Sequence, residues 1–142
     1  MADRNDAWFI AGEVRVVFSR LRRRFREVAA FDELTPSQTV VVSRLAGSEM
    51  SSSDLADAER VRPQSMAATV TVLTERGLVE RAPDPNDGRR QVLSLSAQGR
   101  ALVDGTRRTR DEWLAHAVDE RLTETERETL AAALPLLDRL AD

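Results

Sequence analysis

Arginine supplies every basic side chain of this sequence. The 142 residues contain 21 arginines and no lysine against 24 aspartates and glutamates, so the formal net charge is −3. A guanidinium is a planar group that forms paired hydrogen bonds with phosphates and carboxylates. The chain has no cysteine and a single histidine, His116, which excludes cysteine-ligated zinc and predicts neither a metal site nor a cofactor. Because no Ser/His/Asp set or glycine-rich phosphate loop is visible, we expect no enzymatic activity.

The charges are segregated along the chain. Residues 13–26 hold six arginines and one glutamate, a net of +5, whereas residues 27–59 hold one arginine and seven acids, a net of −6. Residues 60–100 hold seven arginines and four acids, a net of +3, and residues 103–142 hold six arginines and ten acids, a net of −4. A local basic face on an acidic chain is compatible with nucleic-acid binding.

A long amphipathic helix is predicted over about residues 6–30. Its apolar side chains recur at steps of three and four, as in a helix with one buried seam: Trp8, Ala11, Val14, Phe18, Leu21, Phe25 and Val28. Such a helix spans about 35–40 Å, which is longer than a small domain's core, so we expect a partner subunit to cover part of the seam. The basic run at residues 20–26 is interpreted as a solvated face that pairs with the acidic block 103–142, with a nucleic-acid arm as the alternative.

Three shorter helices are predicted to follow. A capping box of Thr35 and Gln38 marks the start of the first, and Pro63 marks the start of the third. The remaining boundary signals are Gly47 and Gly77 as stops, with Ser51, Ser52 and Ser53 as alternative N-caps of the second helix. The side chains expected to face the core are Val41, Val42, Leu45, Leu55, Ala56, Met66, Val70 and Leu73.

The pattern changes from helical to strand-like after residue 77. Residues 78–81 and 91–95 are alternating or β-branched runs, joined by a cluster of turn residues, which predicts a β-hairpin with a protruding tip. Ser96 is expected to cap a fifth helix, which its glycines weaken. A capping box at Thr123 begins a sixth, in which Pro135 is expected to cause a kink or a break.

A short helix, a tight turn, a second helix and a two-stranded hairpin form the layout of a winged helix-turn-helix. The sequence LVERAPDPNDGRR at residues 78–90, continued by SAQGRAL at 96–102, closely resembles the wing and following helix of the MarR family of transcriptional regulators. The similarity extends upstream through Gln38, the Leu-Ala pair at 55–56 and PQSM at 63–66. It covers nearly the whole chain.

The resemblance implies a mainly α-helical fold with a small β-hairpin wing, in which a winged helix-turn-helix core is flanked by N- and C-terminal dimerisation helices. A single domain is expected over residues 1–142, with the winged helix-turn-helix at about 35–102 and the dimerisation helices at about 6–34 and 103–142. The expected assembly is a homodimer. Its predicted interface consists of Trp8, Val14, Phe18, Leu21, Leu130, Leu134 and Leu137.

At the wing, the resemblance implies that Arg89 enters a DNA minor groove and that Asp87, two positions earlier, orients it. An arginine in a narrow and negative groove is a good physical match. The alternative is a salt bridge at the hairpin tip. Arg90 is a candidate for the same DNA site or for a solvated phosphate contact.

The helix that begins at Pro63 is expected to enter the major groove. Beside its core stripe it carries Gln64, Ser65, Ala68 and Thr69. Glutamine can read adenine, serine and threonine can bond bases or phosphates, and a methyl group suits the thymine methyl. The alternative for each residue is an ordinary polar helix face.

Two arginines in the preceding turn depart from the family's usual pattern. Arg60 stands where such turns commonly carry glycine, and Arg62 stands where an N-cap Ser, Thr or Asp is usual. Arg62 forgoes a cap worth about 1 kcal/mol, which suggests a phosphate or guanine contact. Ser51, Ser52 and Ser53 are candidate phosphate contacts at a helix N-terminus, although capping alone explains them equally well.

These features predict a sequence-specific, dimeric transcriptional regulator that binds double-stranded DNA at a pseudo-palindromic operator. The resemblance further implies a repressor that is relieved by a small phenolic or lipophilic anion, a possible effector that the sequence does not identify. A winged-helix module that binds protein without specific DNA binding is the alternative. No apolar run approaches the ~20 residues of a membrane span and no signal-peptide segment follows the start, so we expect a cytoplasmic protein with no membrane partner.

Overall fold

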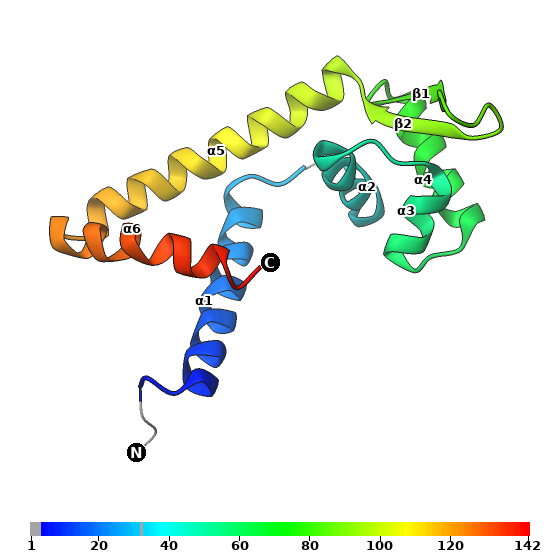
Figure 1. The fold of residues 1–142 in the computed structure, drawn as a ribbon. Coiled ribbons are helices and arrows are strands. Elements are labelled where there is room, and N and C mark those ends of the chain that lie inside the picture. The colour runs from blue at the N-terminus through cyan, green and yellow to red at the C-terminus, as the bar shows by residue number, and fades with distance from the viewer. Residues whose placement is uncertain (1–3, 32) are drawn as a thin grey trace. The chain divides into compact units, whose positions relative to one another are not determined.

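The computed structural model describes residues 4–31 and 33–142. Over those residues the chain forms six α-helices and one two-stranded antiparallel hairpin (Figure 1), which confirms the predicted fold class. The chain divides into two compact units. We call Ala30–Arg107 the hairpin unit, and Met1–Ala29 together with Arg108–Asp142 the helical unit.

The hairpin unit extends a few residues beyond the range of about 35–102 expected for the winged helix-turn-helix. Upstream, Phe31 and Leu34 pack against its core, and downstream Val103 is part of that core. The reason for the difference is therefore hydrophobic contact, which the pattern of turns and caps along the sequence does not report.

Six elements build the hairpin unit in the predicted order. They are α2 (Pro36–Gly47), α3 (Ser52–Glu59), α4 (Pro63–Glu75), β1 (Val79–Pro83), β2 (Gln91–Leu95) and the first turns of α5 (Ala97–Arg121). The start of α2 shows why: the Thr35 hydroxyl accepts the Gln38 backbone N–H at 3.3 Å, and Gln38 Oε1 accepts the Thr35 N–H at 3.1 Å. This capping box satisfies N–H groups that have no partner within the helix, so local sequence determines where α2 begins.

The core of the hairpin unit is formed by α2, α3 and α4 with the inner face of the hairpin. Its buried members include the side chains expected from the sequence: Val41, Val42, Leu45, Leu55, Ala56, Met66, Val70 and Leu73. Burying one such leucine or valine stabilises the fold by about 1.5–3 kcal/mol. Because the core holds α3 and α4 together, it also determines which side chains of α4 face outward.

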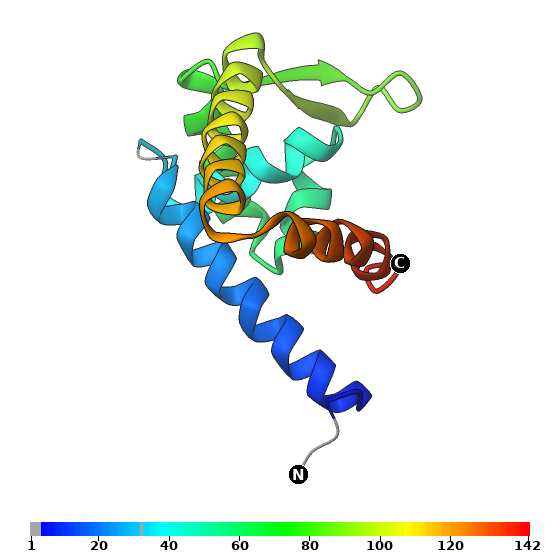
Figure 2. The same ribbon diagram turned by 90° about the vertical axis from the view of Figure 1, so that its left-hand side faces the viewer.

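The hairpin has a register that places Val79 of β1 opposite Leu95 of β2. The loop between the two strands protrudes from the unit in both views (Figures 1 and 2), as predicted. Met50, just before α3, adds a bridge to β2: its N–H donates to the Leu93 carbonyl at 3.2 Å, and its carbonyl accepts the Leu93 N–H at 2.8 Å. No local sequence signal predicts this bridge, since the two residues are far apart in the chain.

Two glycines allow α4, the hairpin and α5 to meet closely. Gly77, just after α4, has a φ of +75°, a left-handed conformation that favours glycine. The Ser96 hydroxyl accepts the Gly99 N–H at 3.0 Å and donates to the Gly77 carbonyl, which confirms the cap of α5. A Cβ atom on Gly99 would lie 2.1 Å from the Leu78 carbonyl oxygen. Gly99, expected only to weaken α5, is therefore required for packing.

The helical unit consists of helices that are held by aromatic and cap contacts. Its elements are α1 (Ala7–Val28), the remainder of α5 and α6 (Glu124–Asp138), which can be followed in Figure 2. The Trp113 ring of α5 packs edge-on against the Phe25 ring of α1, with centroids 5.9 Å apart. The Arg110 guanidinium donates to the Ala29 carbonyl oxygen at 2.8 Å, so α5 supplies a cap for the C-terminal end of α1.

The last helix begins as predicted and is not broken. The Thr123 hydroxyl accepts the Glu126 N–H at 3.3 Å, and Glu126 Oε2 accepts the Thr123 N–H at 2.8 Å. The helix then continues through Pro135 to Asp138. A proline this close to the C-terminal end removes one N–H donor with few residues left to disrupt. Of the two predicted effects, a kink or a break, the break is therefore wrong and the kink stays a prediction.

Among the residues that the structure describes, no arginine of the basic run at residues 20–26 forms an ion pair with an acid of the block 103–142, so the expected pairing is not observed. Arg24 pairs with Glu27 on its own helix, and its guanidinium carbon lies 5.4 Å from the centroid of the Trp113 ring. Acids of the block pair within it, as Glu112 does with Arg108 and Asp119 does with Arg127. Neighbours on one helix or on adjacent helices reach each other at a smaller entropic cost than distant partners do.

Candidate nucleic-acid interface

α4 presents an uncharged polar face opposite its core stripe. Gln64, Ser65 and Ala68 are exposed, and Thr69 is half-buried. The Thr69 hydroxyl donates to the Ser65 carbonyl at 3.1 Å, so its proton is used and its lone pairs and methyl group remain available. The only charged residue within α4 is Glu75, at its C-terminal end. The outward face of α4 can therefore contact a ligand through amide, hydroxyl and methyl groups alone.

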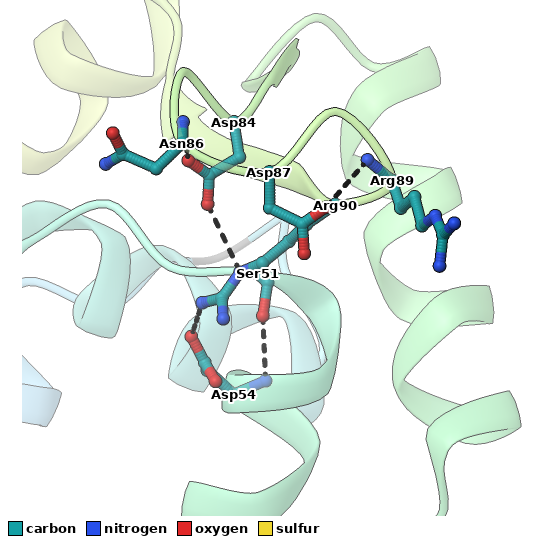
Figure 3. Close-up of polar contacts among 7 residues, drawn as sticks. All are labelled: Ser51, Asp54, Asp84, Asn86, Asp87, Arg89 and Arg90. Atoms are coloured by element: carbon teal, nitrogen blue, oxygen red, sulfur yellow. Dashed lines mark hydrogen bonds and ion pairs between the residues drawn. The ribbon is translucent and has the colours of Figure 1, made fainter.

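The tip of the hairpin is organised by its own aspartates. Asp84 Oδ1 accepts the Asn86 backbone N–H at 2.8 Å, and Asp87 Oδ1 accepts the Arg89 backbone N–H at 3.0 Å (Figure 3). Such Asx turns hold a tight turn without help from the rest of the fold. Asp87 therefore positions Arg89 through its backbone, and the Arg89 side chain is directed away from the aspartates (Figure 3).

Arg90 faces the opposite way and fastens the hairpin tip to α3. Its guanidinium forms an ion pair with Asp54 in the first turn of α3, and its Nε lies 3.6 Å from Asp84 Oδ2 (Figure 3). Two carboxylates thus neutralise Arg90, whose side chain is 43% exposed. This arrangement favours a role in holding the wing over a free phosphate contact. No sequence signal pairs Arg90 with Asp54, because the two residues lie in different elements.

The three serines before α3 have different environments. Ser51 is buried, and its hydroxyl accepts the Asp54 backbone N–H at 3.1 Å, so it is the N-cap of α3. Ser52 is half-buried and Ser53 is exposed. Of the two roles considered for Ser51, helix capping and phosphate contact, capping therefore accounts for the residue.

Most arginines of the basic segment 60–100 are engaged inside the hairpin unit. Their partners are backbone carbonyls for Arg76 and Arg100, the Thr71 hydroxyl for Arg81, and two carboxylates for Arg90. These contacts join α4 to the segment before α2, β1 to α4, and α5 to α2. The segment's excess of positive charge is thus largely used to hold the unit together.

Three arginines of the same segment remain available for a ligand. Arg60, Arg62 and Arg89 are exposed, and within the described part of the chain no group bonds their guanidiniums. Arg60 and Arg62 lie in the turn between α3 and α4, and Arg89 lies at the wing tip. Sequence reasoning selected Arg62 and Arg89 but not Arg60. The signal that pointed to Arg60 was its position where glycine is common.

Other kinds of site find little support in the described residues. His116 is exposed, and its Nε2 lies 3.1 Å from Oε1 of Glu120 on the same helix. Over residues 4–31 and 33–142, no group of three or more His, Cys, Asp or Glu side chains could hold a metal ion. Within those residues, no helix combines the length and the apolar character needed to cross a membrane.

Comparison with known proteins identifies relatives along the whole chain. A family model described as MarR family matches residues 32–90. An uncharacterized HTH-type transcriptional regulator of Mycobacterium bovis is 37% identical over 134 residues, covering 94% of this chain and 93% of the relative. A transcriptional regulator protein from Pseudomonas aeruginosa has a crystal structure with a TM-score of 0.76 at 39% identity, covering 96% of this chain and 97% of that one.

A DNA complex is among the similar structures. It contains a MepR mutant of S. aureus bound to an oligodeoxyribonucleotide, with a TM-score of 0.66 at 19% identity, covering 94% of this chain and 98% of that one. At this identity the likeness shows the fold alone. The same fold, seen in that protein, is thus compatible with a bound oligonucleotide.

Proposed function

The chain belongs to the MarR family of helix-turn-helix transcriptional regulators, and from that premise we propose that it is a dimeric repressor that binds a pseudo-palindromic operator. The observation that carries the proposal is the placement of three exposed arginines, unpaired within the described residues, beside the start of α4 and at the wing tip. In a winged helix-turn-helix the recognition helix enters the major groove and the wing reaches the flanking minor groove. Arginine suits both the phosphates and a narrow minor groove.

The outward face of α4 favours A·T base pairs. A guanine is most often read by a bidentate arginine or lysine, and α4 has neither. Gln64 can form two hydrogen bonds with adenine, while the Ala68 and Thr69 methyl groups can contact the thymine methyl. Guanine readout is then left to Arg62, which precedes α4 and has no side-chain cap bond. The half-site read by α4 is accordingly rich in A·T pairs.

Dimerisation through α1 and α6 would cover apolar side chains that the single chain leaves exposed. Trp8 is 87% exposed, Phe18 is 63% exposed and Leu134 is 56% exposed. Leu130 and Leu137 are also exposed, while Val14 and Leu21 are half-buried and line, with Phe18 and Leu137, an apolar groove of about 510 Å³. Exposed apolar patches of this kind mark interaction surfaces. A two-fold dimer would place two copies of α4 about 34–36 Å apart, one turn of DNA.

A cavity in the hairpin unit is the candidate effector site. It has a volume of about 690 Å³ and is lined by Phe31, Leu34, Leu78, Leu102, Arg76 and Gln98, among others. Mostly apolar walls with a few polar groups suit a small lipophilic ligand. Arg76 already lies 3.4 Å from the carboxylate of Glu33, which also lines the cavity, so an anionic effector would have to take the place of that carboxylate beside Arg76. Benzoate, used as the probe, should raise the melting temperature and weaken DNA binding over the same concentration range. No change in either at millimolar benzoate would contradict this assignment.

Selection from a random duplex library with the purified protein tests the proposal. Enrichment of an inverted repeat with A·T-rich half-sites is expected. Replacing thymine with uracil in the enriched site removes the methyl group alone, and should weaken binding if Ala68 and Thr69 contact it. Enrichment of G·C-rich half-sites would contradict the reading by α4. No enrichment of any duplex would contradict DNA recognition and favour a module that binds protein.

A further inference from the structure

Arg60 has an unusual backbone conformation for its residue type. It ends α3 with a φ of 55° and a ψ of 42°, and within the described residues it is the only non-glycine residue with a positive φ. Its N–H is directed to the Ala56 and Asp57 carbonyls, and the Val61 N–H donates to the Ala56 carbonyl at 3.0 Å. These bonds close the turn by backbone groups alone. Glycine would adopt the same conformation without the steric cost of a Cβ atom.

Among the described residues, the side chain of Arg60 makes no polar contact that stabilises the fold. It is exposed, and its guanidinium has no bonding partner in the portion of the chain that the structure describes. The nearest acid in sequence, Glu59, forms its ion pair with Arg44 of α2. A strained conformation that supports no internal contact is characteristic of a functional position. The conformation and the exposure of Arg60 together point to a contact outside the folded chain.

The location of Arg60 identifies that use. It stands two residues before Arg62, with Val61 between them, in the turn that leads into α4. If α4 enters the major groove as proposed above, this turn passes the edge of the groove, where the DNA backbone runs. We propose that Arg60 binds a backbone phosphate of the operator. This inference rests on the proposed function, and it assigns Arg60 to affinity and register, not to base recognition.

A matched pair of substitutions separates the charge of Arg60 from its backbone strain. Arg60→Gly and Arg60→Ala remove the same charge, but only glycine relieves the strain. The glycine variant should melt about 3–5 °C above the alanine variant. Arg60→Lys keeps the charge and serves as the control for binding. All three variants, as full-length chains, are compared with the wild type.

Binding to a duplex of arbitrary sequence is measured by fluorescence anisotropy between 50 and 200 mM salt. Losing one phosphate contact per subunit removes two per dimer and makes the slope of log K against log salt shallower by about 1.8. The loss of affinity over that range then becomes about tenfold smaller than in the wild type. Both neutral variants should show this change, and Arg60→Lys should keep the wild-type slope.

The outcomes distinguish this inference from the proposed function. A salt-dependent wild type together with a wild-type slope for Arg60→Gly overturns the phosphate contact and leaves DNA binding intact. A wild type that binds no duplex at any salt concentration overturns both. The phosphate contact is supported if the glycine variant binds DNA more weakly than the wild type does while melting at a higher temperature than the alanine variant. Loss of folding then cannot account for the weaker binding.

Discussion

The two adjacent arginines of the wing tip should respond differently to the same substitution. Arg89 has an exposed side chain that no described residue bonds, whereas Arg90 is paired with Asp54 and Asp84. Arg89→Ala should therefore affect DNA binding, and Arg90→Ala should affect chiefly stability. Each variant is the natural control for the other, because both remove one guanidinium from the same loop.

The expected cost of Arg90→Ala follows from the exposure of its ion pairs. The Arg90 side chain is 43% exposed, as is that of Asp54, so solvent screens their attraction. Pairs of this kind contribute about 0.2–1 kcal/mol each, and the two together about 1 kcal/mol. A double-mutant cycle with Asp54→Ala should recover the coupling between the two side chains. The salt slope of DNA binding should stay unchanged, because a neutralised arginine releases no counterion.

The expected cost of Arg89→Ala follows from a contact made in the DNA minor groove. Losing a positioned arginine contact costs about 1–3 kcal/mol of binding, roughly a 5- to 150-fold loss of affinity. The slope of log K against log salt should become shallower by about 0.9 per subunit. Folding stability should not change, since within the described chain the guanidinium supports no other group.

Thermal unfolding and salt-dependent anisotropy on one duplex, measured for both variants, test this reasoning. For Arg90→Ala we expect a lower melting temperature and the wild-type salt slope. For Arg89→Ala we expect the wild-type melting temperature and a shallower salt slope. If Arg90→Ala flattens the slope while Arg89→Ala leaves it unchanged, the roles assigned from the contacts of the two side chains are refuted.

Three further predictions concern assembly and folding. Phe18→Asp places a charge on the exposed apolar groove of the helical unit. At micromolar concentration the variant should sediment with the mass of a monomer and keep its helical circular dichroism. A variant that still sediments as a dimer would contradict the predicted interface. Gly99→Ala should destabilise the fold by about 1–3 kcal/mol in chemical unfolding, because its Cβ would lie 2.1 Å from the Leu78 carbonyl oxygen. Gly105 lies on the same helix as Gly99, and a Cβ there would meet no atom within 4 Å. Gly105→Ala should therefore be neutral or stabilise by up to about 1 kcal/mol. Equal losses of stability for the two variants would argue against the close approach of Gly99 to Leu78.

Local signals in the sequence predicted most of the fold. The capping boxes at Thr35 and Thr123 and the proline at position 63 act within one turn of the helices they begin, so they can be recognised without the fold. The dense turn residues between β1 and β2 act in the same way. The family resemblance rests on the same segment, which is why the wing could be recognised.

Contacts between distant parts of the chain could not be predicted in this way. Periodicity identifies the buried side of a helix, but it does not say which element covers that side. The bridge of Met50 with Leu93 and the contact of Arg110 with Ala29 join residues that are far apart in sequence. The role of Gly99 was missed for the same reason, since the atom that excludes a side chain belongs to another element.

The candidate site shows the same division. The exposed face of α4 follows from helical periodicity, and its residue types were recognised from the sequence. Within the described residues, four of the seven arginines at 60–100 hold the unit together and three are available for a ligand. This division could not be recognised from the sequence, because it depends on tertiary partners. Arg90 was grouped with Arg89 on sequence grounds, and its ion pairs with Asp54 of α3 and Asp84 of the wing separate the two.

Chemical footprinting on the DNA upstream of its own gene tests the central claim most directly. The account predicts two protected patches on one face of the duplex, about one helical turn apart, each with an A·T-rich major groove and a protected minor groove beyond it. The Arg89→Ala variant should lose protection of the outer minor grooves and retain the two central patches. A single unrepeated patch, or no protection at a protein concentration that saturates binding, would contradict a dimeric, sequence-specific DNA-binding regulator.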